Sequence, residues 1–437
     1  MACCVYLCTF TKEGSMKKLV VLMLSAVLFL SFAGLSQATN GDNLISIGPI
    51  SRAMGGVGVA APQDAISAVF ANPAAMCFGP YCPGSEMNFD VTFFMPKAKT
   101  RINNTAIGAF TGGALSGDTG WEDSDADFFV IPALGISMPI TQNLRFGFAA
   151  YGVSGLGVDY RNKFDLDPFT PDNQDVYTNL QILKVAPNLA YMITPNWSVG
   201  ASVHFDYASL NLGQTESSRS GTGVGFQLGT IYKNGPVSAG AVYVSPQKVK
   251  HGAVADLDGD GHNDDLTLES PWSVGFGIAV EPIERVLLFE ANAKYIDWAS
   301  ADGYGDFDWR SQWVLSFGAQ YRPIPKLVLR AGVNWGRNPV EDNDGWEAFG
   351  PPVEVQGKNV NRFQFEVLRT TGFPALVETH VTAGIGYQVT KTITLDLGYT
   401  HAFEKSIKET GTFAGAPVSI ESELYEDSID FGLTWRF

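Results

Sequence analysis

An acidic run between two strand-like segments is the clearest candidate for metal chemistry in the chain. In residues 256–265 five aspartates are spaced around two glycines, and carboxylate oxygens in such a turn are ligands that Ca²⁺ prefers. Thr267 takes the last position of a calcium-loop pattern, where a bidentate Glu is usual, so the affinity should be modest. The run predicts either a calcium site or a simple acidic turn. The candidate ligands are Asp256, Asp258, Asp260 and Asp264.

Cys77 and Cys82 are the only cysteines beyond the first eight residues. In an oxidising compartment a pair at this spacing closes a small disulfide loop. A metal site would need two more soft ligands nearby, and the neighbouring sequence has none. We therefore expect a Cys77–Cys82 disulfide, with two free thiols as the alternative.

Catalytic chemistry has little support in the sequence. Glu378 and His380 share one face of a predicted strand, but no histidine stands beside a recognisable nucleophile motif. We predict that the protein is not an enzyme, and a lipase is the less favoured alternative. The histidines are His204, His251, His262, His380 and His401.

The N-terminal segment has the features of a secretory signal peptide. A basic stretch at Met16–Lys18 precedes an almost entirely apolar run, 19–35, and small residues at 36–38 suit cleavage before Thr39. Residues 1–15 precede a natural start at Met16 and are interpreted as an over-extended start. An N-terminal membrane anchor is the alternative, although the apolar run is short for one.

Removal of residues 1–38 changes the formal net charge from −16 to −18, because three lysines and one glutamate are lost. This acidic balance argues against nucleic acid as a partner. No later stretch is long and apolar enough to form a membrane helix. If the mature protein crosses a membrane, it does so with strands.

Alternation of apolar and polar residues dominates the chain from residue 85 to its end. In the last strand Phe431, Leu433, Trp435 and Phe437 share one face, and polar residues share the other. This pattern predicts a transmembrane antiparallel β-barrel of about fourteen strands with an apolar outside and a polar lumen. The predicted strands are 86–98, 127–139, 144–153, 178–193, 197–211, 220–233, 236–250, 266–281, 286–298, 309–322, 326–337, 376–389, 392–405 and 422–437.

Connections of two lengths alternate along the predicted barrel. Tight turns such as Asn234-Gly235 belong on the periplasmic side, and long connections, including 338–375 and 406–421, belong outside. Aromatic residues near strand ends, among them Trp298 and Trp309, suit the interfacial girdles. A single water-soluble β domain is the alternative, but the lumen charges would then lie in its core.

Three basic residues of the barrel are candidates to meet a ligand carboxylate in the lumen: Lys184, Arg310 and Arg330. His204 and Lys294 face the same way. The alternative is that these groups pair with acidic residues and stabilise the lumen. The acidic candidates are Asp206, Glu290 and Asp396.

Residues 39–84 lack strand alternation and are too apolar for a linker. A short helix at 64–69 should end before Asn72-Pro73. A compact apolar segment ahead of a barrel fits most economically inside it, as a hatch. The alternative for Asn72-Pro73 is an ordinary turn.

The hatch carries a specific family resemblance. The run Arg52–Ala60, then Asp64-Ala65, then Phe70–Ala75 with its Asn-Pro-Ala-Ala motif, resembles the N-terminal hatch of the FadL/TodX family of outer-membrane transporters. The barrel segments Ser270–Gly277 and Leu329–Gly332 are also similar. The cysteine pair and the acidic loop depart from the family pattern.

The resemblance implies a hatch-plugged barrel, 85–437, in the bacterial outer membrane, which takes up hydrophobic small molecules from outside and releases them sideways into the membrane. Long-chain fatty acids or related lipids are the expected ligands, with aromatic hydrocarbons as the alternative and a general diffusion porin as a further one. The implied gating residues are Asp64, Asn72, Pro73 and Ala74.

A kinked third strand, Leu144–Val153, should border the gap in the wall, with Gly147 and Gly152 as kink candidates. We expect a monomer in contact with outer-membrane lipid. Phe437 is interpreted as part of the signal for the barrel-assembly machinery, a role that the resemblance implies.

Overall fold

The computed structural model describes residues 40–80, 82, 84–104, 117–161, 163 and 176–437. The predicted signal peptide lies outside these residues. None of the described helices is long and apolar enough to cross a membrane.

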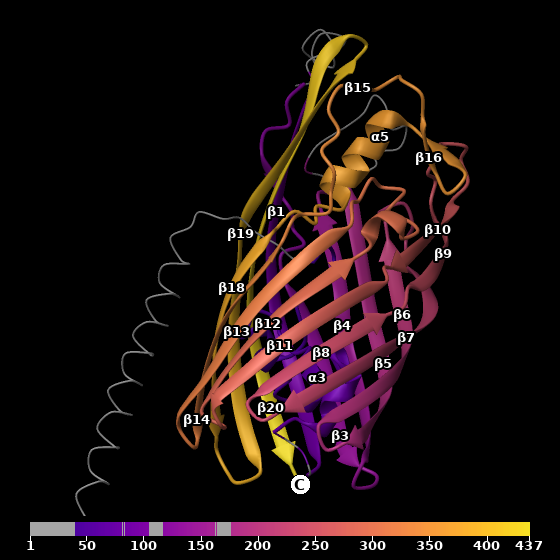
Figure 1. The fold of residues 1–437 in the computed structure, drawn as a ribbon. Helices are drawn as coiled ribbons and strands as arrows, with labels where there is room; N and C mark the ends of the chain where they lie inside the picture. Colours follow the sequence, from indigo (N-terminus) through magenta and orange to yellow (C-terminus); the bar gives the residue numbers. More distant parts are fainter. Residues whose placement is uncertain (1–39, 81, 83, 105–116, 162, 164–175) are drawn as a thin grey trace, which may run out of the picture. The chain divides into compact units, whose positions relative to one another are not determined.

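Fourteen antiparallel strands close into a barrel, as predicted (Figure 1). Closure is made by the last strand, whose register with the first runs from Glu86↔Arg436 to Asn104↔Val418. The strands, in chain order, are β1 (Glu86–Asn104), β3 (Phe129–Pro139), β4 (Leu144–Asp159), β5 (Tyr177–Thr194), β6 (Trp197–Asn211), β7 (Arg219–Asn234), β8 (Val237–Val244), β11 (Ser273–Ile283), β12 (Leu287–Ile296), β13 (Gln312–Ile324), β14 (Leu327–Gly336), β18 (Thr379–Gln388), β19 (Ile393–Phe413) and β20 (Ala416–Arg436).

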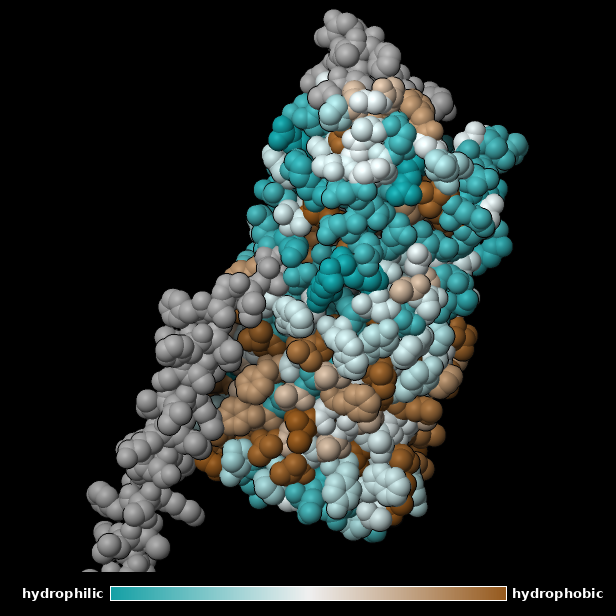
Figure 2. Space-filling view, turned by 45° about the horizontal axis from the view of Figure 1, so that its top comes forward, coloured by the Kyte–Doolittle hydropathy of each residue, from teal (hydrophilic) through white to brown (hydrophobic). Residues whose placement is uncertain are grey.

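The two faces of the barrel wall follow the sequence alternation. In β20, Phe431 and Trp435 are 47% and 44% exposed, whereas Asp430 and Thr434 face the lumen and are buried. On the face in Figure 2, hydrophobic residues gather over the lower part and hydrophilic residues cover the upper part. Lipid replaces water at the apolar band, so the exposed aromatic and aliphatic side chains are stable there.

Two predicted strands are correct only in part, because each is broken at a proline. The segments 236–250 and 266–281 break at Pro246 and Pro271, which have no N–H to donate to a ladder. Beyond these breaks β9 (Gln247–Ala255) and β10 (Asp264–Ser270) pair only with each other. A Cβ at lumen-facing Gly223 of β7 would lie 2.9 Å from the Lys248 carbonyl oxygen, so the hairpin packs on the inner side of the wall.

A third difference concerns residues 406–421, which were expected to form a loop but form a strand hairpin. Strands β19 and β20 continue through it and turn at Ala414-Gly415, both with positive φ. Lys408 pairs across this ribbon with Glu421. Above the membrane both faces of a strand meet water or protein, so apolar alternation is not needed there.

The long connections carry short elements of their own. They are β2 (Glu122–Asp123), the 3₁₀ turn η2 (Trp298–Ser300), β15 (Trp346–Glu347), β16 (Val353–Val355), β17 (Lys358–Val360), α5 (Arg362–Val367) and the π-helical turn η3 (Leu368–Gly372). Trp298 and Trp309 are buried against Tyr304 rather than in a membrane girdle, which corrects their predicted place.

The segment ahead of the barrel contains α2 (Pro49–Arg52), α3 (Ala65–Ala71) and the 3₁₀ turn η1 (Pro73–Cys77). The predicted helix is confirmed, and it ends at Ala71, before Asn72, as expected. Its first turn is capped by Asp64, whose Oδ1 accepts from the Ser67 N–H at 3.0 Å. These elements contact the inner side of the strands, and this segment, 40–84, is called the hatch below.

Candidate functional site

The hatch packs against lumen-facing glycines contributed by most barrel strands. A Cβ at Gly332 would overlap the Gly55 N–H, and a Cβ at Gly200 would lie 2.5 Å from the Ala74 nitrogen. Only glycine allows two backbones to approach this closely. The glycines that contact the hatch are Gly135, Gly147, Gly200, Gly229, Gly240, Gly277, Gly318, Gly332, Gly384, Gly398 and Gly432.

Asn72 is the most heavily bonded of the predicted gating residues. Its side chain is fully buried, and Nδ2 lies 2.8 Å from the Val59 carbonyl, 3.2 Å from that of Thr230 and 3.3 Å from that of Ala241. Its Oδ1 accepts from the Ala74 N–H at 3.1 Å and so caps η1, which begins at Pro73. One amide thus joins two parts of the hatch to strands β7 and β8.

Asp64 lies at the other end of the same helix. Burial, and next the carboxylate of Glu86, raise the pKa of Asp64 to about 7. Glu86 accepts from the Ala65 N–H at 2.9 Å, so the helix start is bonded to β1 as well.

Two carboxylates of the barrel wall, Asp430 and Glu290, bind the hatch in contacts that sequence reasoning did not predict. The Arg52 guanidinium forms a 2.9 Å ion pair with Asp430 and donates to Ser428 at 2.6 Å. Glu290 accepts from the Gly58 and Ala60 N–H groups at 3.1 and 2.7 Å. Their place on the lumen face was predictable from alternation, but their hatch partners carried no sequence signal.

The predicted ligand-binding cations are not brought together. Lys184 pairs with Asp206 at 3.3 Å, and Arg330 pairs with Asp396 at 2.6 Å, both buried in the lumen. Arg310 lies in an outer connection, where Nη2 donates to the Val340 carbonyl at 2.8 Å. Lys184 and Arg330 therefore fit the alternative, in which basic lumen residues pair with acidic ones and stabilise the lumen.

The wall is interrupted between β3 and β4. Ladder pairing between them ends at Ala133↔Tyr151, although β3 continues along β1 to Phe129 and β4 continues along β5 to Asp159. Pro132, the first β3 residue beyond the last pair, has no N–H to donate. At its other end the interruption is limited by a hydrogen bond, in which the Asp125 N–H donates to the Asp159 carbonyl at 2.9 Å.

A bulge marks the same point on β4. The register with β5 shifts between Gly152 and Ser154, and the Val153 carbonyl accepts from the hatch N–H of Leu44 at 3.2 Å. The irregularity thus falls beside Gly152, one of the two kink candidates. Gly147 instead lies in regular pairing and packs on Met76 of the hatch, which corrects its predicted role.

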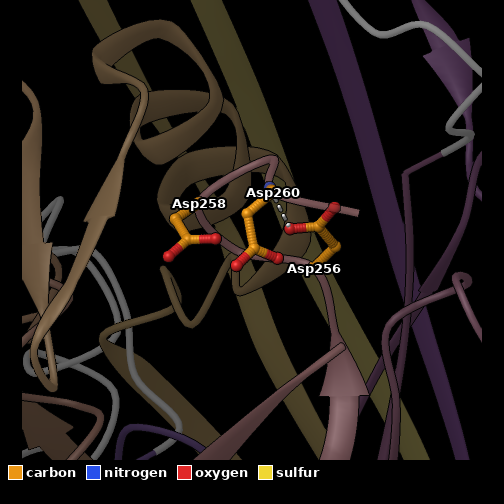
Figure 3. Close-up of side chains that lie close together, drawn as sticks. All are labelled: Asp256, Asp258 and Asp260. Carbon is orange, nitrogen blue, oxygen red and sulfur yellow. Dashed lines mark hydrogen bonds between the residues drawn. The ribbon is translucent and has the colours of Figure 1, made fainter. Parts of the chain in front are cut away.

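The acidic run forms a compact turn (Figure 3), in which Asp256, Asp258 and Asp260 offer oxygens within 4.8 Å of one another. Asp256 accepts from the Asp260 N–H at 3.2 Å. Asp264 is turned toward Lys358, with a 2.5 Å ion pair, and Asp258 lies 3.4 Å from the same ammonium. The calcium site stays a prediction, with Lys358 as a competing cation.

Cys77 and Cys82 are free thiols in the structure, so the expected disulfide is not formed there. Cys77 is buried in η1, whereas Cys82 is half-buried and lies 3.7 Å from an Arg145 guanidinium nitrogen. Burial raises the pKa of the Cys77 thiol to about 11. The arrangement keeps Cys77 in its unreactive protonated form.

A closed antiparallel barrel with an apolar belt and a packed internal hatch defines the class of outer-membrane channel proteins. The chain belongs to the outer membrane protein transport protein (OMPP1/FadL/TodX) family, whose model matches residues 35–345. This family places the protein in the bacterial outer membrane, and it is a family of transport channels rather than enzymes.

Solved structures agree in fold. The toluene transporter TodX of Pseudomonas putida matches with a TM-score of 0.63 and 18% identity, over 90% of this chain and 99% of that one. A FadL homologue from Pseudomonas aeruginosa matches with a TM-score of 0.62 and 16% identity, over 91% and 99%. The toluene transporter TbuX of Ralstonia pickettii gives 0.55 and 18%, over 88% and 98%. A search of curated protein sequences found no match.

Proposed function

We propose that the protein takes up hydrophobic small molecules from outside and releases them through the gap between β3 and β4 into the outer membrane. The observation that carries this proposal is the interruption of the wall above Ala133↔Tyr151. An unpaired strand edge inside a membrane is costly unless protein covers it, so such a gap is retained for a use.

The hatch makes a straight path through the lumen unfavourable. It is bonded to the inner wall at Asn72, Arg52 and Glu290, and glycines bring its backbone against the strands. A sideways exit avoids this obstruction. An apolar ligand also gains by leaving directly into lipid, because it is not hydrated again on the way.

The hydrogen bond between Leu44 of the hatch and Val153 at the bulge of β4 supports a link between the hatch and the gap. Movement of the hatch N-terminus removes the bond that holds the bulge. In this proposal ligand binding above the hatch shifts Leu44 and widens the gap.

Two ligand classes are compatible with this route, fatty acids and aromatic hydrocarbons. Structural relatives of the same fold include toluene transporters, and that substrate is theirs by name. We further propose that the chain acts as a monomer without enzymatic activity. The terminal aromatic residue, 58% exposed at Phe437, is the proposed contact for the barrel-assembly machinery.

A paired uptake and conductance measurement tests the proposal. Cells that produce the protein should take up the neutral fluorescent probe 1-N-phenylnaphthylamine faster than cells without it. The purified protein in planar bilayers should show no steady ion conductance. A large open conductance without added probe uptake would instead favour the diffusion porin.

A further inference from the structure

A small apolar cavity of about 40 Å³ lies directly behind the gap. Its apolar lining comes from the unpaired part of β4, from β1 and β20, from Leu44 of the hatch and from Pro374-Ala375. In this conformation it has room for only a few water molecules and not for an aromatic ring. Passage of a ligand therefore requires side chains around the gap to move. The principal apolar residues are Leu156, Val158, Phe94, Ala98 and Leu424.

Strand β3 lies over the outer face of β4 at the gap. Two of its inward-facing side chains therefore cover the gap from the membrane side. Ile131 and Phe129 belong to the inward face of β3, since their neighbours Val130 and Phe128 are 55% and 57% exposed outward. The Ile131 Cγ2 lies 2.6 Å from where a Cβ of Gly152 would be.

The Phe129 ring makes the second contact, because it lies 3.0 Å from where a Cβ of Gly157 would be. Gly157 points away from the buried Leu156 and Val158, so it belongs to the outer face of β4. Strand β3 thus overlaps the outer face of β4 here. This close packing of β3 on β4 is possible because Gly152 and Gly157 carry no side chain. Ile131 and Phe129 can open it by changing rotamer.

No cation is among the described residues that line the cavity. Among its described lining residues only Asp42 and Glu426 are charged, and both carry carboxylates. The Tyr304 hydroxyl donates to Asp42, and His380 lies 3.9 Å from Glu426. A ligand carboxylate placed here would meet like charges in a poorly hydrated space, which is unfavourable.

We propose that Phe129 and Ile131 form a shutter that sets the size of the molecule leaving through the gap, and that Asp42 and Glu426 select neutral ligands over anions. This inference rests on the proposed sideways exit and deepens it, because it names the ligand class as compact, neutral and apolar. It also assigns specificity to side chains that contact the ligand rather than to the lumen cations.

The test compares uptake of a neutral probe and an anionic one by cells that produce each variant. The probes are 1-N-phenylnaphthylamine and cis-parinarate, at pH 7. The double variant Phe129→Ala/Ile131→Ala should take up the neutral probe about tenfold faster, which corresponds to about 1.4 kcal/mol of barrier. The outward neighbours supply the matched control, Phe128→Ala/Val130→Ala, which should behave as wild type. Heat-modifiable migration in gels verifies that each barrel is folded.

Two further variants separate closure from charge. Gly157→Leu adds bulk against the Phe129 ring and should slow the neutral probe without changing the lining charge. Asp42→Asn/Glu426→Gln should raise the uptake of cis-parinarate relative to the neutral probe.

The failures are distinguishable. If the wild type takes up neither probe faster than cells without the protein, the proposed function fails. If it takes up the neutral probe but the shutter and control variants match each other, the shutter is wrong. Equal uptake of both probes by the wild type, unchanged in Asp42→Asn/Glu426→Gln, contradicts the charge selection.

Discussion

Replacement of Asn72 by alanine should loosen the hatch while leaving the barrel intact. The side chain caps η1 through Ala74 and donates to carbonyls of β7 and β8, at Thr230 and Ala241. Loss of a cap costs about 1 kcal/mol. Each lost hydrogen bond to the wall costs about 1 kcal/mol.

These contributions total about 3 kcal/mol, which corresponds to about a hundredfold rise in the population of a detached hatch. Hydrogen exchange followed by mass spectrometry reports that population directly, because backbone amides exchange when the segment opens. In Asn72→Ala, peptides covering 65–77 should exchange about a hundredfold faster than in wild type, while peptides from β19 and β20 should not change.

Asn143→Ala is the matched control, because Asn143 lies in an exposed periplasmic turn and should not affect the hatch. Exchange of 65–77 at the wild-type rate in Asn72→Ala would refute the assignment of Asn72 as a hatch anchor. Equal acceleration throughout the barrel would show that the amide stabilises the whole fold instead.

Three further predictions concern single groups. Because the pKa of Asp64 is raised to about 7 from an ordinary value near 3.8, the folded hatch favours the neutral acid. The stability of the hatch should therefore be highest below about pH 4 and fall as the pH rises to 7. Asp64→Asn should abolish this pH dependence in hydrogen exchange. Burial and the pKa of about 11 should keep Cys77 unlabelled by maleimide at pH 7 while Cys82 reacts, and failure of both to react under non-reducing conditions, reversed by reductant, would indicate the disulfide. If the acidic turn binds calcium, isothermal titration should give a site that is lost in Asp258→Ala and kept in Asp265→Asn; absence of heat with the wild type ends that idea.

The barrel was predictable because a membrane imposes a strict rule on its strands. Residues such as Leu433 and Trp435 must face lipid and Asp430 must not, so alternation marks both the strand and its orientation. The same rule explains where the prediction fails. The outer half of β19 and β20 lies beyond the apolar belt, so its apolar residues, such as Val418 and Ile420, pack inward against the long connections instead of facing lipid.

Prolines were an available signal that the alternation concealed. Pro246 and Pro271 stand within segments that read as strands, and each ends one ladder and starts another. Proline alone would not have been decisive, because Pro96 and Pro187 lie within the continuous strands β1 and β5.

The candidate site was less predictable, because it depends on which backbones meet. The hatch motif around Asn72 and the helix start at Asp64 were recognisable from residue types. The partners of the acidic lumen residues were predictable only in part. Asp206 and Asp396 pair with cations as expected, but Glu290 binds the hatch backbone. The gap in the wall follows from where pairing stops, and no local pattern determines that point.

The central claim is that ligands leave through the gap between β3 and β4, and a reversible staple across it tests this most directly. Ile131→Cys/Gly152→Cys, made together with Cys77→Ser and Cys82→Ser, joins two positions whose Cβ atoms would lie 3.9 Å apart, a separation that a disulfide can span. A staple at Leu134→Cys/Ala150→Cys, in the regularly paired part of the same strands, is the control.

Oxidation should abolish uptake of 1-N-phenylnaphthylamine in the Ile131→Cys/Gly152→Cys protein, reduction should restore it, and the control staple should have no effect. Uptake at the wild-type rate by the fully oxidised Ile131→Cys/Gly152→Cys protein would contradict the sideways route.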